Sequence, residues 1–151
     1  FSQVEFNQFL NFDLRLLGGT GARLRLLKNT STTLHTGLGA MLESERYNTD
    51  KIVAADTDIL LTRATTYLSL SHELSSSASL TLTGYYQPAL TAPADYRILV
   101  DTELEARMTE RLSLAVSFSG RLDSQPPEVL ENEVAIRALD TATTTALKVT
   151  F

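Results

Sequence analysis

The sequence predicts an all-β protein, and the spacing of its apolar residues is the first reason. Apolar side chains occupy every second position, as at Leu14 and Leu16, with charged ones such as Asp13 and Arg15 between them. This period of two is that of a β-strand. Threonine, a good strand former, is abundant, and no stretch combines helical spacing of apolar residues with a capping residue. With 151 residues, 43% of them hydrophobic, we expect one domain, residues 1–151.

The lengths of the connections between the expected strands are the second reason, and they predict how the strands are arranged. Short turns near Asn29, Ser75 and Glu110 alternate with longer loops at 48–57, 89–95 and 125–139, and the short loop 8–11 falls on the long-loop side. This alternation is typical of an antiparallel up-and-down transmembrane β-barrel, with long loops extracellular and both termini periplasmic. The eight expected strands are residues 1–7, 12–27, 32–47, 58–72, 78–88, 96–108, 112–124 and 140–151.

Composition excludes several other classes. The chain has no cysteine, which rules out a disulfide framework and thiol metal sites. Its net charge of -5 is scattered without a basic stripe, so we expect no nucleic-acid partner. No run reaches the roughly 18 to 20 apolar residues that a transmembrane helix needs. The chain begins at Phe1 without an initiator methionine or a signal peptide, so we expect a processed product or a fragment.

The two alternating registers differ sharply in charge. Even positions of the second to seventh strands are almost uncharged and include Leu38, Leu68, Leu82 and Phe118, whereas odd positions carry most of the charges. Because charges are costly against hydrocarbon, the odd register is expected to face the lumen. The expected lumen-lining residues are Arg15, Arg23, Arg25, Arg63, Tyr67, Arg97, Asp101, Glu103, Glu105, Arg107, Arg121 and Asp123.

A soluble lipocalin-like barrel has the same alternation turned inside out, so alternation alone does not decide between the two. Aromatic residues on the apolar register near the long loops favour the membrane, because they suit an interfacial girdle; they are Phe6, Phe12, Tyr86 and Tyr96. The terminal Phe151 is similar to the signal by which outer-membrane barrels are handed to their assembly machinery. The expected partners are therefore outer-membrane lipid, lipopolysaccharide and that machinery, while any further protein partner is unknown.

Three segments carry a family resemblance. They are residues 13–21, reading DLRLLGGTG, the terminal segment 140–151, and a middle pattern made of Arg111, Leu112, Ser119, Arg121, Asp123, Ser124, Pro126 and Pro127. Together they resemble the salt-induced outer-membrane protein family, a group without an established function. The resemblance implies an outer-membrane barrel and transfers no catalytic residue. It also implies strand-like sequence before the position of Phe1, so the N-terminal part is expected to be missing and the intact barrel to have about 12 strands.

The inward charges nearly balance, with eight basic and nine acidic residues by register. We expect opposite charges to pair and fill a narrow barrel, although a selectivity lining is the functional alternative. Taking 109–111 as a turn places Arg97 opposite Asp123 near the extracellular rim, in a pair worth about 1 kcal/mol or less.

Glycines form a second feature of the inward register. Folding the hairpin about 28–31 sets Gly21 opposite Gly39 and Arg23 opposite Gly37, on the register that also holds Gly19. The bare backbone is expected to make room for arginine side chains. A small-molecule recess is the alternative.

No motif predicts an enzyme, a cofactor or a metal. His35 and His72 fall on opposite faces, no G-x-S-x-G elbow occurs, and the glycine-rich GGTG segment lacks a phosphate-loop lysine. We therefore expect a structural or passive small-solute transport role with a charge-balanced polar lumen. The alternative is a binding module whose acidic loops engage a cation, protein or surface polymer, against the plainer possibility of a solvated acidic rim. The loop acids are Asp50, Asp56, Asp58, Asp95, Glu128, Glu131 and Glu133.

Overall fold

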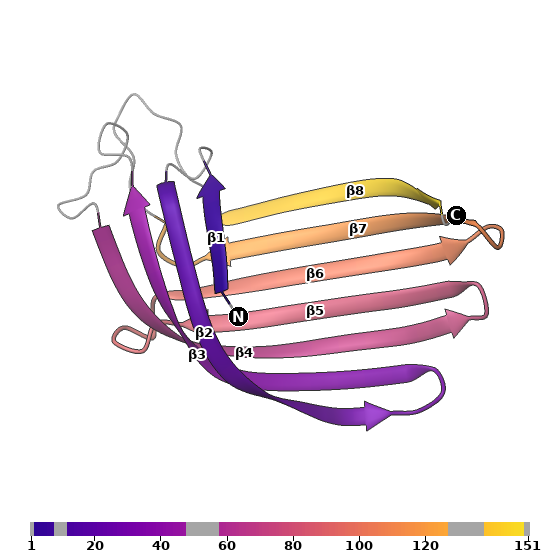
Figure 1. Cartoon of the computed structure of the whole chain (residues 1–151), viewed down its shortest axis with the longest axis horizontal. Coiled ribbons are helices and arrows are strands. Elements are labelled where there is room, and N and C mark those ends of the chain that lie inside the picture. Colours follow the sequence, from indigo (N-terminus) through magenta and orange to yellow (C-terminus); the bar gives the residue numbers. More distant parts are fainter. Residues whose placement is uncertain (1, 8–11, 48–57, 127–137, 150–151) are drawn as a thin grey trace.

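The computed structural model describes residues 2–7, 12–47, 58–126 and 138–149, which form eight β-strands (Figure 1). Each strand lies within three residues of the bounds expected from the sequence. The strands are β1 (Ser2–Asn7), β2 (Phe12–Lys28), β3 (Thr32–Tyr47), β4 (Asp58–Ser75), β5 (Ala78–Pro88), β6 (Tyr96–Arg107), β7 (Leu112–Asp123) and β8 (Leu139–Val149). The all-β prediction is confirmed, and among these residues there is no helix long and apolar enough to cross a membrane.

The strands form one antiparallel sheet in the order of the chain, from β1 to β8. In the part of the chain that the structure describes, β1 pairs only with β2 and β8 only with β7. The sheet therefore keeps two free edges. A meander of antiparallel strands is confirmed, whereas the described strands do not close into a barrel.

The tight turns lie together at one end of the sheet, where side chains stabilise them (Figure 1). The Asn29 carboxamide oxygen accepts hydrogen bonds from the backbone amides of Ser31 and Thr32, at 3.1 and 2.7 Å. The Thr109 hydroxyl accepts one from the amide of Leu112 at 3.1 Å. Such local bonds between a side chain and the backbone favour turns over continued strand.

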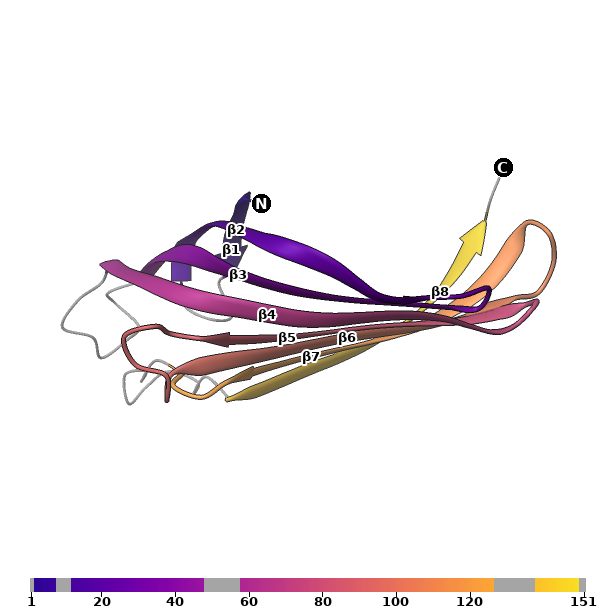
Figure 2. The ribbon, with the colours of Figure 1, turned by 90° about the horizontal axis from the view of Figure 1, so that it is seen from below.

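The sheet is strongly curled, so that β2, β3 and β4 lie over β5, β6 and β7 (Figure 2). Gly21 and Gly39 are direct partners where β2 and β3 curve. A Cβ atom added to Gly39 would lie 2.5 Å from the carbonyl oxygen of Thr20, and one added to Gly21 would lie 2.7 Å from that of Leu38. The two backbones approach more closely here than any side chain would allow, which permits the bend.

The two faces of the curled sheet differ in the side chains that they bury and expose. We call the side that carries the odd positions of β2–β7 and the even positions of β8 the inner face, and the opposite side the outer face. Side chains of non-neighbouring strands meet on the inner face, so it lines the inside of the curl. Its buried residues include Arg15, Leu17, Met41, Glu43, Arg63, Thr65, Arg97 and Ala115. The outer face exposes large apolar side chains, among them Leu16, Leu24, Leu38, Leu42, Leu60, Leu68, Leu104, Val116, Phe118 and Leu147.

Candidate functional site: a buried charge cluster and the cavity beside it

Glu43 of β3 is the centre of a cluster of charged side chains at the loop end of the inner face. Its side chain is completely buried, and its carboxylate accepts hydrogen bonds from three arginines. Nε of Arg15 on β2 lies 2.6 Å from Oε1, and Nε of Arg63 on β4 lies 2.6 Å from Oε2. Nη1 of Arg97 on β6 also donates to Oε1. One carboxylate thus joins strands from both halves of the curl.

Two further acids on the described part of the chain belong to the cluster. Asp95 accepts from both terminal nitrogens of Arg63, at 3.0 and 3.1 Å, in a two-point contact. Asp123 accepts from Nε of Arg97 at 2.8 Å. The described members therefore carry three positive and three negative charges. None of the buried side-chain nitrogen and oxygen atoms that the structure describes lacks a partner. Buried charges require such complete pairing, because an unpaired one is costly.

The end of β5 explains how Asp95 reaches this cluster. β5 ends at Pro88, a residue that cannot donate a hydrogen bond to a neighbouring strand. The chain then continues along β4 in the register of the β4–β5 pairing, where Ala89 bridges Arg63 and the Leu90 amide donates to the carbonyl oxygen of Thr62 at 2.8 Å. Ala89 is fully buried by this packing. The loop is thereby held against β4, and the Asp95 carboxylate lies within hydrogen-bonding distance of Arg63.

A looser set of charges lies toward the turn end of β6, β7 and β8. Nζ of Lys148 contacts Glu103 at 2.6 Å and Glu105 at 2.9 Å. The hydroxyls of Ser117 and Ser119 donate to Glu103 at 3.2 Å and to Asp101 at 2.8 Å. The side chains of Lys148, Glu103 and Glu105 are about a third or more exposed, so water screens their attraction and the ion pairs contribute little to stability.

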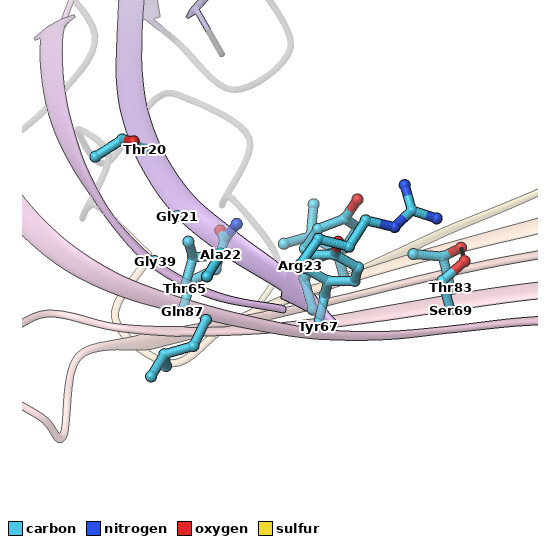
Figure 3. Close-up of a pocket in the computed structure, with 13 residues that line it drawn as sticks. Thr20, Gly21, Ala22, Arg23, Gly39, Thr65, Tyr67, Ser69, Thr83 and Gln87 are labelled. Carbon is cyan, nitrogen blue, oxygen red and sulfur yellow. Dashed lines mark hydrogen bonds between the residues drawn. The ribbon is translucent and has the colours of Figure 1, made fainter. Parts of the chain in front are cut away.

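Beside the buried cluster the inner face is hollowed into a cavity of about 650 Å³ (Figure 3). Its walls come from β2, β3, β4, β5 and β6; the lining residues are Thr20, Gly21, Ala22, Arg23, Leu38, Gly39, Thr65, Tyr67, Ser69, Thr83, Tyr85, Gln87 and Leu99. The rings of Tyr67 and Tyr85 are 5.5 Å apart and tilted by 38°. The hydroxyls of Ser69 and Thr83 are 3.2 Å apart. No acidic residue is among the lining residues.

The whole chain, residues 1–151, matches the family described as protein of unknown function, DUF481. The chain belongs to this family. No curated protein and no solved structure matches it.

The predicted β6–β7 hairpin is confirmed. Arg97 pairs with Asp123 and Asp101 with Ser119, as the turn at 109–111 predicted. The Arg97–Asp123 pair was expected to lie close to water, but the two side chains are only 9% and 19% exposed. The reason is that Glu43 lies on the other side of Arg97 and covers it.

The central role of Glu43 was missed, although its register contained a signal. In the β2–β3 pairing, Arg15 lies opposite Glu45 and Leu17 opposite Glu43, so Arg15 is a diagonal neighbour of Glu43. The sequence could thus have suggested this pair. The contact with Arg97 could not have been found in this way, because β3 and β6 are not neighbours in the sheet.

Two further interpretations of the sequence require correction. Gly37 was expected to make room for an arginine, but the ring of Tyr67 occupies that space, and a Cβ added to Gly37 would run into it. Aromatic rings commonly cover glycines of a neighbouring strand. Asp95 was grouped with a solvated acidic rim, but it is bound to Arg63.

Some of the remaining predicted site residues lie in the described part of the chain, and others lie outside it. Tyr86 and Tyr96 lie with their rings 5.8 Å apart near the loop end of β5 and β6. The side chains of Phe6 and Phe12 lie outside the described part, as does Phe151, and the pairing register shifts between Phe12 and Leu14. The other predicted lumen residues on described strands are Arg25, Arg107 and Arg121. The loop acids Asp50, Asp56, Glu128, Glu131 and Glu133, and the side chain of Asp58, also lie outside the described part.

The two histidines lie apart from each other, and each contacts a residue on a neighbouring strand. Nδ1 of His72 lies 2.8 Å from the hydroxyl of Thr32. His35 pairs with Arg25 in the β2–β3 ladder. Within the described ranges, no group of three or more histidine, aspartate and glutamate side chains could hold a metal ion.

Proposed function

We propose that the chain forms the wall of a bacterial outer-membrane β-barrel with a structural or passive small-solute transport role. The observation that carries this proposal is the inverted burial of the two faces. Glu43 and Arg63 are at most 1% exposed, whereas Leu38 and Leu60 are 69% and 73% exposed. In a soluble barrel the apolar side chains fill the interior, so inverted burial favours lipid around the outer face.

Strand length and aromatic placement support the same proposal. A tilted strand needs about 9 to 11 residues to cross a bilayer, and β2–β8 contain between 11 and 18. The Tyr86–Tyr96 pair near the loop end suits an interfacial girdle. The resemblance to the salt-induced outer-membrane protein family agrees with this placement. Lipid and lipopolysaccharide would then surround the outer face, with the barrel assembly machinery acting on Phe151.

The free edges must be covered if the sheet spans a membrane, because an unpaired backbone amide in hydrocarbon costs several kcal/mol. Either β1 and β8 join directly or further strands lie between them. A closed barrel of about 12 strands would follow from the upstream strands that the family resemblance implies. The charge-balanced inner face argues against a strong preference for ions of one sign, which rings of like charge would produce.

Single-cysteine labelling tests the membrane placement directly, because the natural chain has no cysteine. We would attach an environment-sensitive fluorophore to Leu68→Cys on the outer face and to the adjacent Ser69→Cys on the inner face. In phospholipid vesicles, nitroxide-labelled lipid should quench the Leu68 label strongly and the Ser69 label weakly. Equal quenching at both positions, or quenching of neither, would contradict the proposal.

Solute passage is tested separately, by swelling of vesicles that contain the protein. The buried cluster narrows the loop end of the inner face, so we expect slow passage of small neutral solutes such as glycerol and faster passage after Glu43→Ala. The matched control is Glu103→Ala, which removes a carboxylate from the looser set. If solutes passed through neither the natural protein nor the Glu43→Ala variant, the structural role would be favoured over transport.

A further inference from the structure

The cavity on the inner face is the feature that the proposed barrel role does not use. Its volume of about 650 Å³ lies within the range of about 300 to 1,000 Å³ that small-molecule sites span. The cavity is on the inner face, so its chemistry does not depend on what surrounds the outer face. Glycines form part of its wall: Gly21 and Gly39 leave the backbone bare between β2 and β3.

The charge of the cavity wall points to an anion. Arg23 is the one charged residue among the lining residues. In Figure 3 its side chain extends from β2 over the ring of Tyr67. Among the described residues Arg23 has no ion-pair partner, unlike Arg63 and Arg97 of the neighbouring cluster. A guanidinium without a carboxylate partner is suited to bind a ligand carboxylate in a two-point hydrogen-bonded contact.

The other lining side chains point to a ring. Tyr67 and Tyr85 present two tilted aromatic rings, against which a flat ligand ring can pack. Ser69 and Thr83 add hydroxyls, and Gln87 adds a carboxamide, each able to donate to or accept from a ligand hydroxyl. Apolar faces combined with a few convergent polar groups are typical of ligand sites.

We propose that this cavity binds a small carboxylate that carries a ring with one or more hydroxyl groups. The Arg23 guanidinium binds the carboxylate, the ring packs against Tyr67 and Tyr85, and Ser69, Thr83 and Gln87 offer bonds to the hydroxyl groups that the ring carries. The ring can be aromatic, as in a hydroxybenzoate, or that of a sugar acid, since both share this chemistry.

Titration calorimetry on the full chain in detergent micelles tests the proposal without depending on lipid insertion or solute passage. The probes are 4-hydroxybenzoate and galacturonate, and their neutral counterparts are 4-hydroxybenzamide and galactose. At least one acid should bind with a Kd below about 1 mM and at least tenfold more tightly than its counterpart, because a hydrogen bond to a charged group is lost in the neutral compound. The acid that binds identifies the kind of ring.

Two variants and one control locate the binding. Arg23→Gln should weaken it at least tenfold, whereas Arg25→Gln, which removes the same charge two residues away and outside the cavity wall, should not. Thr83→Leu, which fills the cavity, should also weaken it, and circular dichroism checks that each variant keeps its strands. The proposal is overturned if neither acid binds below about 1 mM, if the neutral compounds bind equally well, or if Arg25→Gln weakens binding as much as Arg23→Gln.

Discussion

Arg97 and Asp123 are direct partners across the β6–β7 ladder, joined by a hydrogen bond of 2.8 Å from Nε to Oδ2. On its other side, Arg97 donates from Nη1 to the buried carboxylate of Glu43. Arg97 therefore donates hydrogen bonds to two carboxylates. Asp123 is the more exposed of the two, whereas Glu43 is fully buried. This asymmetry predicts how charge changes at the two positions will differ.

We expect Arg97→Gln to lower the free energy of unfolding by about 3 kcal/mol, because it leaves Glu43 with one cation fewer in a buried site. Asp123→Asn should cost about 1 kcal/mol, since this carboxylate is partly exposed. Urea unfolding of the protein in phospholipid vesicles measures both values. Equal losses of stability would show that the contact between Arg97 and Glu43 contributes nothing to the free energy of unfolding.

Reversing both charges provides a sharper test of the same asymmetry. An isolated pair would tolerate Arg97→Glu combined with Asp123→Arg better than either change alone. Here the double variant places a second carboxylate beside Glu43, so it should remain less stable than Asp123→Arg alone. A double variant as stable as the natural protein would mean that Arg97 and Glu43 do not interact in solution.

The faces and the local registers could be predicted from the sequence, but the cluster could not. Alternation assigns each residue to a face, and turn lengths fix the pairing of neighbouring strands, as for Gly21 with Gly39. Neither determines which distant strands meet inside the curl. The contact between Glu43 and Arg97 depends on the bend at the glycines, and that between Arg63 and Asp95 on the loop after Pro88. Both contacts follow from the curl of the sheet and the path of a loop, which the alternation of residues in the sequence does not determine.

Glu43→Gln should be among the most destabilising single changes in the described strands. It removes the charge that three arginines share and leaves those buried guanidinium groups with one carboxylate fewer, at a cost of about 3 to 5 kcal/mol. The control is Glu103→Gln, which should cost much less because the Glu103 side chain is 38% exposed. Unfolding midpoints in urea compare the two, and similar midpoints would rule out a structural role for the cluster.

Gly37→Ala should lower the free energy of unfolding by about 1 to 3 kcal/mol, because the added methyl group overlaps the ring of Tyr67. Gly18→Ala is the matched control, since a Cβ there meets nothing within 4 Å. Removing the ring in the double variant Gly37→Ala with Tyr67→Ser should reduce the loss of stability that the alanine causes. Additive costs of the two changes would show that ring and methyl group do not collide.

Deletion of Phe151 should lower the amount of assembled protein in cells and leave the stability of the refolded protein nearly unchanged. A single interfacial side chain contributes at most a few kcal/mol by burial, whereas an assembly signal acts before folding is complete. Immunoblots of outer-membrane fractions, with urea unfolding of the purified protein beside them, separate the two effects. Normal amounts after deletion would remove the argument for a terminal signal.

Adjacent arginine substitutions on β5 test the assignment of the two faces. Leu82 pairs with Leu70 and Thr102 on the outer face, whereas Thr83 pairs with Ser69 and Asp101 on the inner face. Leu82→Arg would place a charge against hydrocarbon, which costs about 2 to 4 kcal/mol near the bilayer midplane. Thr83→Arg would place the same charge on the polar side.

The residue opposite Thr83 on the neighbouring strand β6 should make Thr83→Arg milder still. Asp101 lies directly opposite Thr83 and is exposed, so an arginine at position 83 gains an acidic neighbour. We therefore expect Leu82→Arg to reduce the yield of folding into phospholipid vesicles severely, and Thr83→Arg to reduce it little, as measured by protection from added protease. If Thr83→Arg were the more damaging of the two, the apolar face would be the inside of a soluble barrel and the membrane proposal would be wrong.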